Sequence, residues 1–517
     1  MQQVKPALNR KFLEDKLLGT EIANYHREIL DYPEKVIQFG EGNFLRAFVE
    51  WMFHNMNKQG LFKGRVVVVQ PIPQGRVANL NEQDGLYTLI LRGLQGGNLI
   101  DKKEVIPTIS RGLEAYSQWE EVLKCAENPE IEYLISNTTE AGISYNPEDQ
   151  LNDAPPASYP GKVTIYLYHR YQYFSGDSSK GMVIIPCELI DRNGDNLKRI
   201  VLRLANEWGL PQGFIDWINN ANYFLNTLVD RIVTGYPFNE VENIEKELGY
   251  KDQNLNTGEI FHLWVIEGDK SLSQRLPFTE AGLNVKWVDD LTPYRTRKVR
   301  ILNGAHTSSY ALSFLSGIDL VRDAVKDGIV GEFMRETIFE EIIPTLDLDT
   351  EELKDFAGNV LERFENPFIA HKWQDIALNA TSKFKARVLP SLQGYIKQEG
   401  VVPKKLAFSL AALIAFYRGT EIRNNKLVAH RENSEYLISD DLSALDFFQK
   451  LWREFDAGKS DPITLSRKVL ANIDFWGEDL NNLPGLAVTV GAYLQEILIE
   501  GMGKSVENLV RTPIPVV

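Results

Sequence analysis

Four short runs rich in β-branched residues recur between residues 35 and 187, and the stretches between them have the periodicity of amphipathic helices. The runs are KVIQFG (35–40), RVVVVQ (65–70), EYLIS (132–136) and MVIIPC (182–187). Strands that alternate with helices indicate a parallel sheet, because each crossover helix packs back onto the sheet. Residues 146–162, rich in Pro, Asp and Asn, are predicted to form a loop. The first half is therefore predicted to be an α/β domain with a mostly parallel sheet.

From about residue 290 the strand signal fades and helical periodicity dominates. Helices are predicted within residues 330–346, 351–364, 404–419 and 485–502. A chain of 517 residues with 44% apolar composition is long enough for two or three domains. We expect an α/β domain at residues 1–288 and a mostly α-helical domain at residues 289–517.

Composition and charge argue against several classes of protein. The net charge of −15, from 56 basic and 71 acidic residues, disfavours nucleic acid as a partner because like charges repel. Two cysteines are too few for a disulfide framework, and the polar N-terminus has no apolar signal region. The longest apolar run, Leu406 to Tyr417, is too short to span a bilayer, and the seven histidines show no metal-ligand spacing. We expect a cytoplasmic protein without a membrane partner or a bound metal.

The first run continues into a G-x-G turn formed by Gly40 and Gly42, followed by a helical pattern. In dinucleotide-binding folds the first glycine makes the turn and the second lets the backbone approach the pyrophosphate. Leu45 stands where a third glycine is usual, and Arg46 is a candidate charge for the pyrophosphate. A plain strand-to-helix turn is the alternative.

The ends of the next two strands carry mixed signals for a dinucleotide. The second run ends in Gln70 and Pro71 without the acid that usually binds the adenosine ribose, which leaves NADH versus NADPH open. Asn137 and Thr138 follow the third run, where small polar residues contact cofactors. The alternative there is a helix cap by Thr139 and Glu140.

The motif KVRILNGAH (298–306) places Lys298, Asn303 and His306 at the spacing K-x4-N-x2-H. At about 100° per residue, an α-helix brings Asn303 and His306 onto nearly the same face, with Lys298 within reach. A buried lysine exchanges protons, and an amide N–H polarises a carbonyl, so the trio suits ketone reduction. The alternative is a solvated basic face, because Lys298 belongs to a cluster with Arg295, Arg297 and Arg300.

Together with TLVDRI (227–232), these motifs resemble the polyol-specific long-chain dehydrogenases, a family that includes mannitol 2-dehydrogenase and the hexuronate reductases. The resemblance implies a Rossmann-type N-terminal domain, a mostly α-helical C-terminal domain, NAD as cofactor and no metal. It implies that Lys298 is the general acid, and that Asn303 and His306 bind the reacting oxygen and nearby hydroxyls. The implied cofactor-binding residues are Phe39, Gly40, Gly42, Asn43, Phe44, Arg46, Asn137, Thr138 and Asp230. For Asp230 the alternative is a salt bridge with Arg231 or a helix partner.

Within this family, SNTTEAGISY (136–145), IIPCELIDRNGD (184–195) and FSLAALIAFYRG (408–419) are most similar to hexuronate reductases. This implies reduction of D-tagaturonate to D-altronate in galacturonate catabolism. Mannitol dehydrogenases carry an oxyanion-hole asparagine where this chain has Leu189, which makes Glu188 a candidate for substrate binding. Reduction of fructuronate, a mannitol-type reaction and a catalytically silent dinucleotide-binding regulator remain alternatives.

A hexuronate carries a carboxylate, which calls for cationic side chains. The candidates are Lys383, Arg387 and His371; Lys383 and Arg387 are four residues apart and share a helix face, whereas Lys385 does not. A basic surface strip is the alternative. The expected partner is thus a small hexuronate, bound by a monomer or small homo-oligomer.

Overall fold

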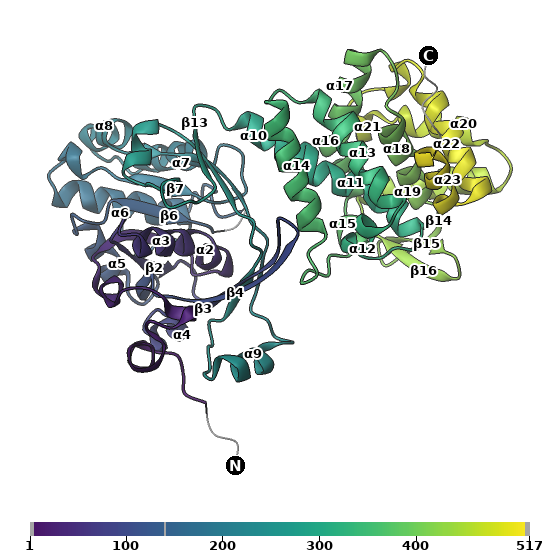
Figure 1. Cartoon of the computed structure of the whole chain (residues 1–517). Helices are drawn as coiled ribbons and strands as arrows, with labels where there is room; N and C mark the ends of the chain where they lie inside the picture. The colour runs from purple at the N-terminus through teal and green to yellow at the C-terminus, as the bar shows by residue number, and fades with distance from the viewer. Residues whose placement is uncertain (1–4, 139–140, 512–517) are drawn as a thin grey trace. The chain divides into compact units, whose positions relative to one another are not determined.

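The computed structural model describes residues 5–138 and 141–511, and the chain divides into two compact units at residues 1–291 and 292–517 (Figure 1). The first unit contains most of the strands and the second contains mostly helices. Among the described residues, no helix is both long and apolar enough to cross a membrane.

A six-stranded sheet of order β5-β2-β1-β6-β7-β8 organises the first unit, and every neighbouring pair in it is parallel. The strands are β1 (Glu34–Phe39), β2 (Arg65–Gln70), β5 (Ile109–Glu114), β6 (Tyr133–Ser136), β7 (Val183–Pro186) and β8 (Tyr223–Phe224). The four predicted strands are confirmed as β1, β2, β6 and β7. Since β2 and β6 flank β1, the strand order reverses there, and ligands bind at such switch points beyond the carboxyl ends of the strands.

The two faces of this sheet are buried by different elements, because successive side chains of a strand point to opposite faces. Val36 and Val66 lie in one core with α3 (Val49–Lys58), whereas Ile37 and Val67 lie in another. The helices of this second core are α5 (Trp119–Ala126), α6 (Tyr159–Tyr173), α7 (Asn193–Glu207) and α8 (Gln212–Ala221). The predicted loop at residues 146–162 therefore ends earlier than expected, because α6 begins at Tyr159.

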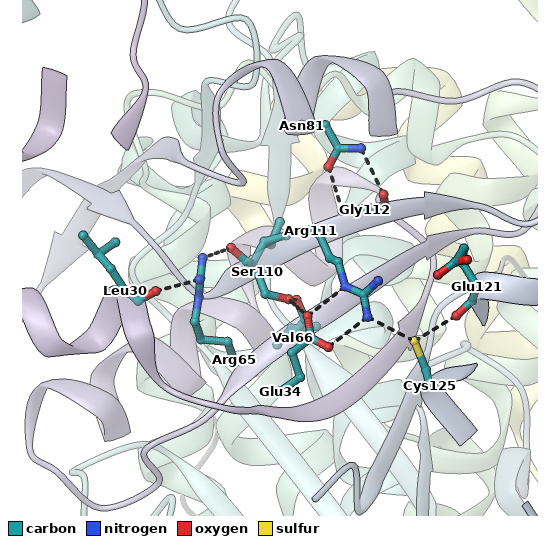
Figure 2. Close-up of polar contacts among 11 residues, drawn as sticks. Leu30, Glu34, Arg65, Val66, Asn81, Ser110, Arg111, Gly112, Glu121 and Cys125 are labelled. Atoms are coloured by element: carbon teal, nitrogen blue, oxygen red, sulfur yellow. Dashed lines mark hydrogen bonds and ion pairs between the residues drawn. The ribbon is translucent and has the colours of Figure 1, made fainter. Parts of the chain in front are cut away.

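Hydrogen bonds and an ion pair connect the amino ends of β1, β2 and β5 to one another and to the preceding segment (Figure 2). Arg111 donates to both carboxylate oxygens of Glu34, at 2.9 and 3.0 Å, and Ser110 donates to the same carboxylate at 2.8 Å. Arg65 donates to the carbonyl of Leu30 at 2.8 Å. These contacts lie at the opposite ends of the strands from the carboxyl ends, which remain available for a ligand.

Two smaller sheets complete the first unit and were not predicted. One has the order β10-β11-β3-β4 and the other β13-β12-β9. Their strands are β3 (Tyr87–Gln95), β4 (Asn98–Ile106), β9 (Asn226–Asp230), β10 (Val233–Gly235), β11 (Asn256–Gly258), β12 (Leu263–Glu267) and β13 (Val285–Val288). Residues 8–30 pack their apolar side chains against Leu86, Val105 and Tyr250.

The second unit is mostly helical, as predicted, but it also contains a three-stranded antiparallel sheet of order β14-β15-β16. Its strands are β14 (Gly419–Arg423), β15 (Lys426–Arg431) and β16 (Ser434–Ile438). The helices that carry candidate site residues or pack against them are α10 (Thr292–Arg297), α11 (Gly304–Leu315), α14 (Thr350–Phe364), α15 (Trp373–Ile376), α16 (Ala380–Arg387), α17 (Leu389–Glu399) and α18 (Lys404–Phe416). Farther along the chain lie α19 (Leu442–Asp456), α20 (Pro462–Leu470), α22 (Leu486–Glu500) and α23 (Met502–Arg511).

Candidate functional site

The turn after β1 uses its two glycines for different reasons. Gly40 has a φ of +115°, and a Cβ there would lie 3.0 Å from the carbonyl oxygen of Asn137. The fold itself therefore requires glycine at this position. Gly42 precedes α2 (Asn43–Ala47) with an ordinary φ of −63°, and a Cβ there would meet nothing within 4 Å. Because no atom of the described residues restricts a side chain at Gly42, the bare backbone leaves room for a ligand to approach.

A buried polar network supports this turn. The side-chain amide of Gln38 donates to the carbonyl of Gly40 at 2.8 Å and to the carboxylate of Glu50 at 2.7 Å. The hydroxyl of Tyr87 lies 2.8 Å from the other oxygen of Glu50 and 2.6 Å from the carbonyl oxygen of Arg46. Burial raises the pKa of Glu50 to about 7. The Gly40 turn is thus supported by the carboxyl group of Glu50, whose protonation changes near pH 7.

Arg46 is buried and holds the turn from within the protein. Its guanidinium donates to the carbonyls of Glu41 and Asn254 and, at 2.6 Å, to the side chain of Asn43. It also lies 5.1 Å from the ring centroid of Tyr87. These contacts give Arg46 and Asn43 a structural role, and their contact with a pyrophosphate stays a prediction.

The two phenylalanines predicted to contact a cofactor face the core with their rings. Phe39 packs against Tyr159 with ring centroids 5.5 Å apart, and Phe44 stacks on Phe48 at 5.0 Å. Phe39 reaches the site through its backbone, since its carbonyl accepts a hydrogen bond from the N–H of Asn137 at 3.2 Å.

A cavity of about 350 Å³ lies beyond the carboxyl ends of β1, β2 and β6. Its lining comprises Gly40, Glu41, Gly42, Pro71, Ile72, Asn137, Thr138, Ala141, Gly142, Ser144, Ala157, Ser158, Tyr159 and Lys162. The structure therefore brings Gly40 and Gly42 together with Asn137 and Thr138, as the sequence predicts. Thr139 and Glu140, the alternative helix cap, lie outside the described residues.

Glu188 connects the ends of β6 and β7. Its buried carboxylate accepts hydrogen bonds from the backbone N–H of Thr138 at 2.9 Å, from the Thr138 hydroxyl at 3.0 Å and from the Ser136 hydroxyl at 3.1 Å. Burial raises the pKa of Glu188, and the hydrogen bonds oppose this rise. Contact of Glu188 with a substrate stays a prediction. The neighbouring Leu189 is 60% exposed.

Asp230 ends strand β9 and is buried. Arg231 donates to the backbone carbonyls of Ala47, Glu259 and Ile260, and its guanidinium lies 4.2 Å from the ring centroid of Trp51. Burial lowers the pKa of Arg231 to about 9. Contact of Asp230 with a cofactor stays a prediction.

Lys162 lines the same cavity and was not predicted from the sequence. Its ammonium group is buried and donates to the carbonyls of Pro156 and Ala157, at 2.6 and 2.9 Å. Burial lowers its pKa to about 8. A lysine inside the first turn of a helix that follows a Pro-rich loop carries no specific sequence signal, because its burial depends on where the loop folds back.

In the second unit, the segment Lys298–Asn303 is a π-helix between α10 and α11. The angle of about 100° per residue therefore does not apply between Lys298 and Asn303, because i→i+5 hydrogen bonds widen the turn, and the convergence of Lys298, Asn303 and His306 stays a prediction. Isolated π-turns within helices are frequent at functional sites. Lys298 and Asn303 are both half-buried rather than buried.

The basic cluster around Lys298 is not a solvated face. Arg297 is buried and pairs with Glu352 of α14 at 2.7 Å. Arg300 is half-buried and donates to the hydroxyl of Ser391 of α17 at 3.0 Å. These contacts fix the backbone on either side of Lys298.

His306 is buried on α11 among aromatic rings. It stacks on Phe364 with ring centroids 4.1 Å apart, and the ring of His371 lies edge-on at 5.2 Å. The Nε2 atom of His306 has no hydrogen-bond partner among the described residues. Burial lowers the pKa of His306 well below its usual range, and electrostatic interaction with the nearby His371, Arg363, Arg387 and Lys383 lowers it further. The imidazole is therefore neutral at physiological pH.

Lys383 and Arg387 lie on α16, both half-buried, whereas Lys385 on the same helix is exposed. A Cβ at Gly304 would lie 3.2 Å from the carbonyl oxygen of Arg387, so this glycine allows α11 to approach the end of α16 closely. Arg387 lies 3.5 Å from the hydroxyl of Thr307, which neighbours His306. Burial lowers the pKa of both Lys383 and Arg387.

The structure thus gathers His306, His371, Lys383 and Arg387 in one part of the second unit. Arg363, which was not predicted as a site residue, is buried on α14 and acts electrostatically on His306. The sequence around Arg363 has the pattern of an ordinary amphipathic helix, which gives no indication of this role. The cations of this group, Arg363, Lys383 and Arg387, favour an anionic ligand. In the described parts of the chain, no group of three or more His, Cys, Asp or Glu side chains is arranged to hold a metal ion.

Two family models cover most of the chain. The mannitol dehydrogenase Rossmann domain matches residues 34–280, and the mannitol dehydrogenase C-terminal domain matches residues 290–498.

Relatives named altronate oxidoreductase are similar over nearly the full length. Those from Halalkalibacterium halodurans and Bacillus subtilis are 45% identical over 92% and 94% of this chain and over 93% and 97% of their own lengths. The one from Enterobacter sp. is 47% identical over 92% of this chain and 97% of its own length.

Two solved structures have the same fold. One is Pseudomonas fluorescens mannitol 2-dehydrogenase in a ternary complex with NAD and D-mannitol, with a TM-score of 0.67 and 22% identity over 98% of this chain and 100% of that one. The other is a substrate-free D-sorbitol dehydrogenase, with a TM-score of 0.78 and 21% identity over 96% of this chain and 100% of that one. They confirm the predicted fold class.

Proposed function

Because this chain belongs to the mannitol dehydrogenase family, we propose that it is an NAD-dependent oxidoreductase that interconverts D-tagaturonate and D-altronate. The observation that carries this proposal is the 45–47% identity, over at least 92% of the chain, to proteins named altronate oxidoreductase. The reaction belongs to galacturonate catabolism, and we assign the protein to the cytoplasm as a monomer or small homo-oligomer.

Residues 1–288 are proposed to bind NAD(H), which supplies or accepts the hydride. The cavity beyond β1 fits a dinucleotide in two respects. A side chain at Gly42 would project into open space, which leaves room for the ligand. Gly40 adopts the positive φ that the tight turn after β1 requires. Asn137 and Thr138 add polar groups to the wall of this cavity, and Lys162 adds a cation. Thr138 is held in place by Glu188, so this wall is preorganised.

Residues 289–517 are proposed to bind the hexuronate and to move the proton. In reduction the carbonyl carbon gains a hydride and its oxygen gains a proton, which Lys298 supplies. In oxidation Lys298 takes this proton back. Asn303 donates a hydrogen bond to the reacting oxygen, which stabilises the negative charge that develops there. The neutral His306 offers its unpartnered Nε2 to a substrate hydroxyl.

The carboxylate of the substrate is assigned to Arg387 and Lys383, with His371 beside them. Both cations are half-buried, where a charge-assisted hydrogen bond is stronger than at an exposed site. Their pKa values are lowered by burial, which indicates that each lacks full solvation and gains from an anionic partner. A neutral sugar alcohol offers no such partner, so this charge favours a uronate over a mannitol-type substrate.

The direct test is the loss of NADH absorbance when the purified protein meets D-tagaturonate, with D-fructuronate and D-fructose in parallel assays. We expect turnover of D-tagaturonate at least tenfold faster than of either alternative, since a site that pairs buried polar groups rejects mismatched ligands. Preference for D-fructuronate or D-fructose refutes the assigned substrate. NADH binding without turnover of any of the three refutes the enzymatic role.

A further inference from the structure

Glu41, the middle residue of the G-x-G turn, extends its side chain to the loop that follows β2. A Cβ at Gly75 of that loop would lie 2.3 Å from a carboxylate oxygen of Glu41. The same carboxylate accepts a hydrogen bond from the backbone N–H of Arg76. Glu41 also lines the cavity together with Pro71 and Ile72, which directly follow β2. A carboxylate from the first strand's turn therefore stands at the carboxyl end of the second strand.

Gln70, at the end of β2, is engaged in shaping this loop. Its side-chain amide donates to the carbonyls of Ile72 and Pro73, at 3.1 and 3.2 Å. Its amide oxygen accepts the backbone N–H of Val77 at 3.3 Å. The side chain of Gln70 is 3% exposed, so little of it faces a ligand. The position that usually supplies the ribose-binding acid does not supply one here.

In dinucleotide-binding sheets, an acid at the end of the second strand accepts hydrogen bonds from the adenosine ribose and excludes a 2′-phosphate by charge repulsion. Resting on the proposed NAD-dependent function, we propose that Glu41 performs this role from the G-x-G turn and makes the protein selective for NADH over NADPH. Glu41 is then the specificity-determining residue for the cofactor, and the missing acid after β2 is replaced from a different segment of the chain.

The surroundings of Glu41 fit this assignment. Burial raises its pKa, whereas the backbone hydrogen bonds and the nearby Arg46 lower it, so the carboxylate is held in a partly desolvated position. A ribose hydroxyl that donates a hydrogen bond to the Glu41 carboxylate replaces the hydrogen bonds from water that this carboxylate loses on burial. Arg76, on the same loop, is exposed. The residue at the end of β2, Gln70, carries no negative charge. Without the charge of Glu41, Arg76 is the residue placed to attract a 2′-phosphate.

The test compares cofactor affinity in the full-length wild type, Glu41→Gln and a matched control, Glu82→Gln. Glu82 is an exposed glutamate on α4 (Val77–Glu82), the helix that follows the same loop. Dissociation constants for NADH, NADPH, 5′-ADP and 2′,5′-ADP are measured by tryptophan fluorescence and calorimetry. We expect the wild type to prefer NADH, and Glu41→Gln to shift the NADH-to-NADPH affinity ratio toward NADPH roughly tenfold or more. We expect 2′,5′-ADP to gain relative to 5′-ADP in the same variant, and the control to behave as the wild type.

Two further variants keep the outcome decisive. Glu41→Asp retains the charge on a shorter side chain. We therefore expect this variant to bind NADH more weakly than the wild type and still to exclude NADPH. Glu41→Gln combined with Arg76→Gln loses the gained affinity for NADPH. An unchanged affinity ratio in Glu41→Gln, with unchanged thermal stability, overturns the role of Glu41. Should Glu41→Gln be unstable, a loss of NADPH exclusion in Glu41→Asp overturns it instead. Because these are binding measurements, they separate this inference from the turnover assay that tests the proposed function.

Discussion

Replacing Arg387 by methionine tests the proposed recognition of the substrate carboxylate. Methionine keeps an unbranched side chain on α16 and removes the guanidinium. The hydrogen bond of Arg387 to Thr307, at 3.5 Å, is long and contributes little to folding. The structural cost of the change is therefore small, and its main effect falls on the bound anion.

The magnitude follows from the environment of Arg387. A charge-assisted hydrogen bond contributes about 1.5–3 kcal/mol, and Arg387 is half-buried, so a loss of about 2 kcal/mol is expected. This corresponds to a rise of roughly 30-fold in the KM for D-tagaturonate. The kcat changes less, because a carboxylate remote from the reacting carbonyl is held equally in the ground state and the transition state.

The assay measures KM and kcat for D-tagaturonate and for the neutral ketose D-fructose, in the wild type, Arg387→Met and Lys385→Met. Lys385 is the control because it is exposed on the same helix. Lys385→Met leaves both KM values unchanged. An equal rise in KM for the charged and the neutral substrate in Arg387→Met refutes the assignment of Arg387 to the carboxylate.

Three further predictions concern catalysis, stability and metal. Lys298→Ala removes the proton donor, so we expect kcat to fall by roughly a hundredfold or more. The dissociation constant for NADH is expected to change less than about threefold. Retained turnover contradicts the role of Lys298 as the proton donor. Burial raises the pKa of Glu50 from 4.5 to about 7, so its protonated form stabilises the fold fully below pH 4.5 and this contribution is lost as the pH rises to about 7. Glu50→Gln therefore flattens the pH dependence of the free energy of unfolding by up to about 3 kcal/mol in urea titrations at pH 5 and pH 8, and an unchanged slope contradicts this. Treatment with EDTA leaves turnover unchanged, and a clear loss that zinc or magnesium restores contradicts a metal-free reaction.

The central strands were predictable because each is a continuous apolar run buried on both faces. β4 was missed because its exposed residues interrupt the apolar pattern of NLIDKKEVI (98–106). The strands β14 to β16 carry charged side chains at many positions and pair across tight turns. Their identity as strands depends on pairing partners more than on local composition.

The candidate site was predictable where local spacing decides the geometry. The turn at Gly40 and Gly42 and the shared face of Lys383 and Arg387 follow from chain-local rules. The π-helix at Lys298–Asn303 did not follow, because its hydrogen-bond pattern depends on how the flanking helices pack. The reach of Glu41 to the loop after β2 depends on sheet order, which no short motif encodes.

The most direct test of the proposed function identifies the product of the reaction. The protein is incubated with D-tagaturonate and NADH, and the product is identified by carbon-13 NMR while NADH consumption is followed in the same sample. We expect D-altronate as the single product, formed in a one-to-one ratio with the NADH consumed. Formation of a different hexonate, or consumption of NADH without D-altronate, contradicts it.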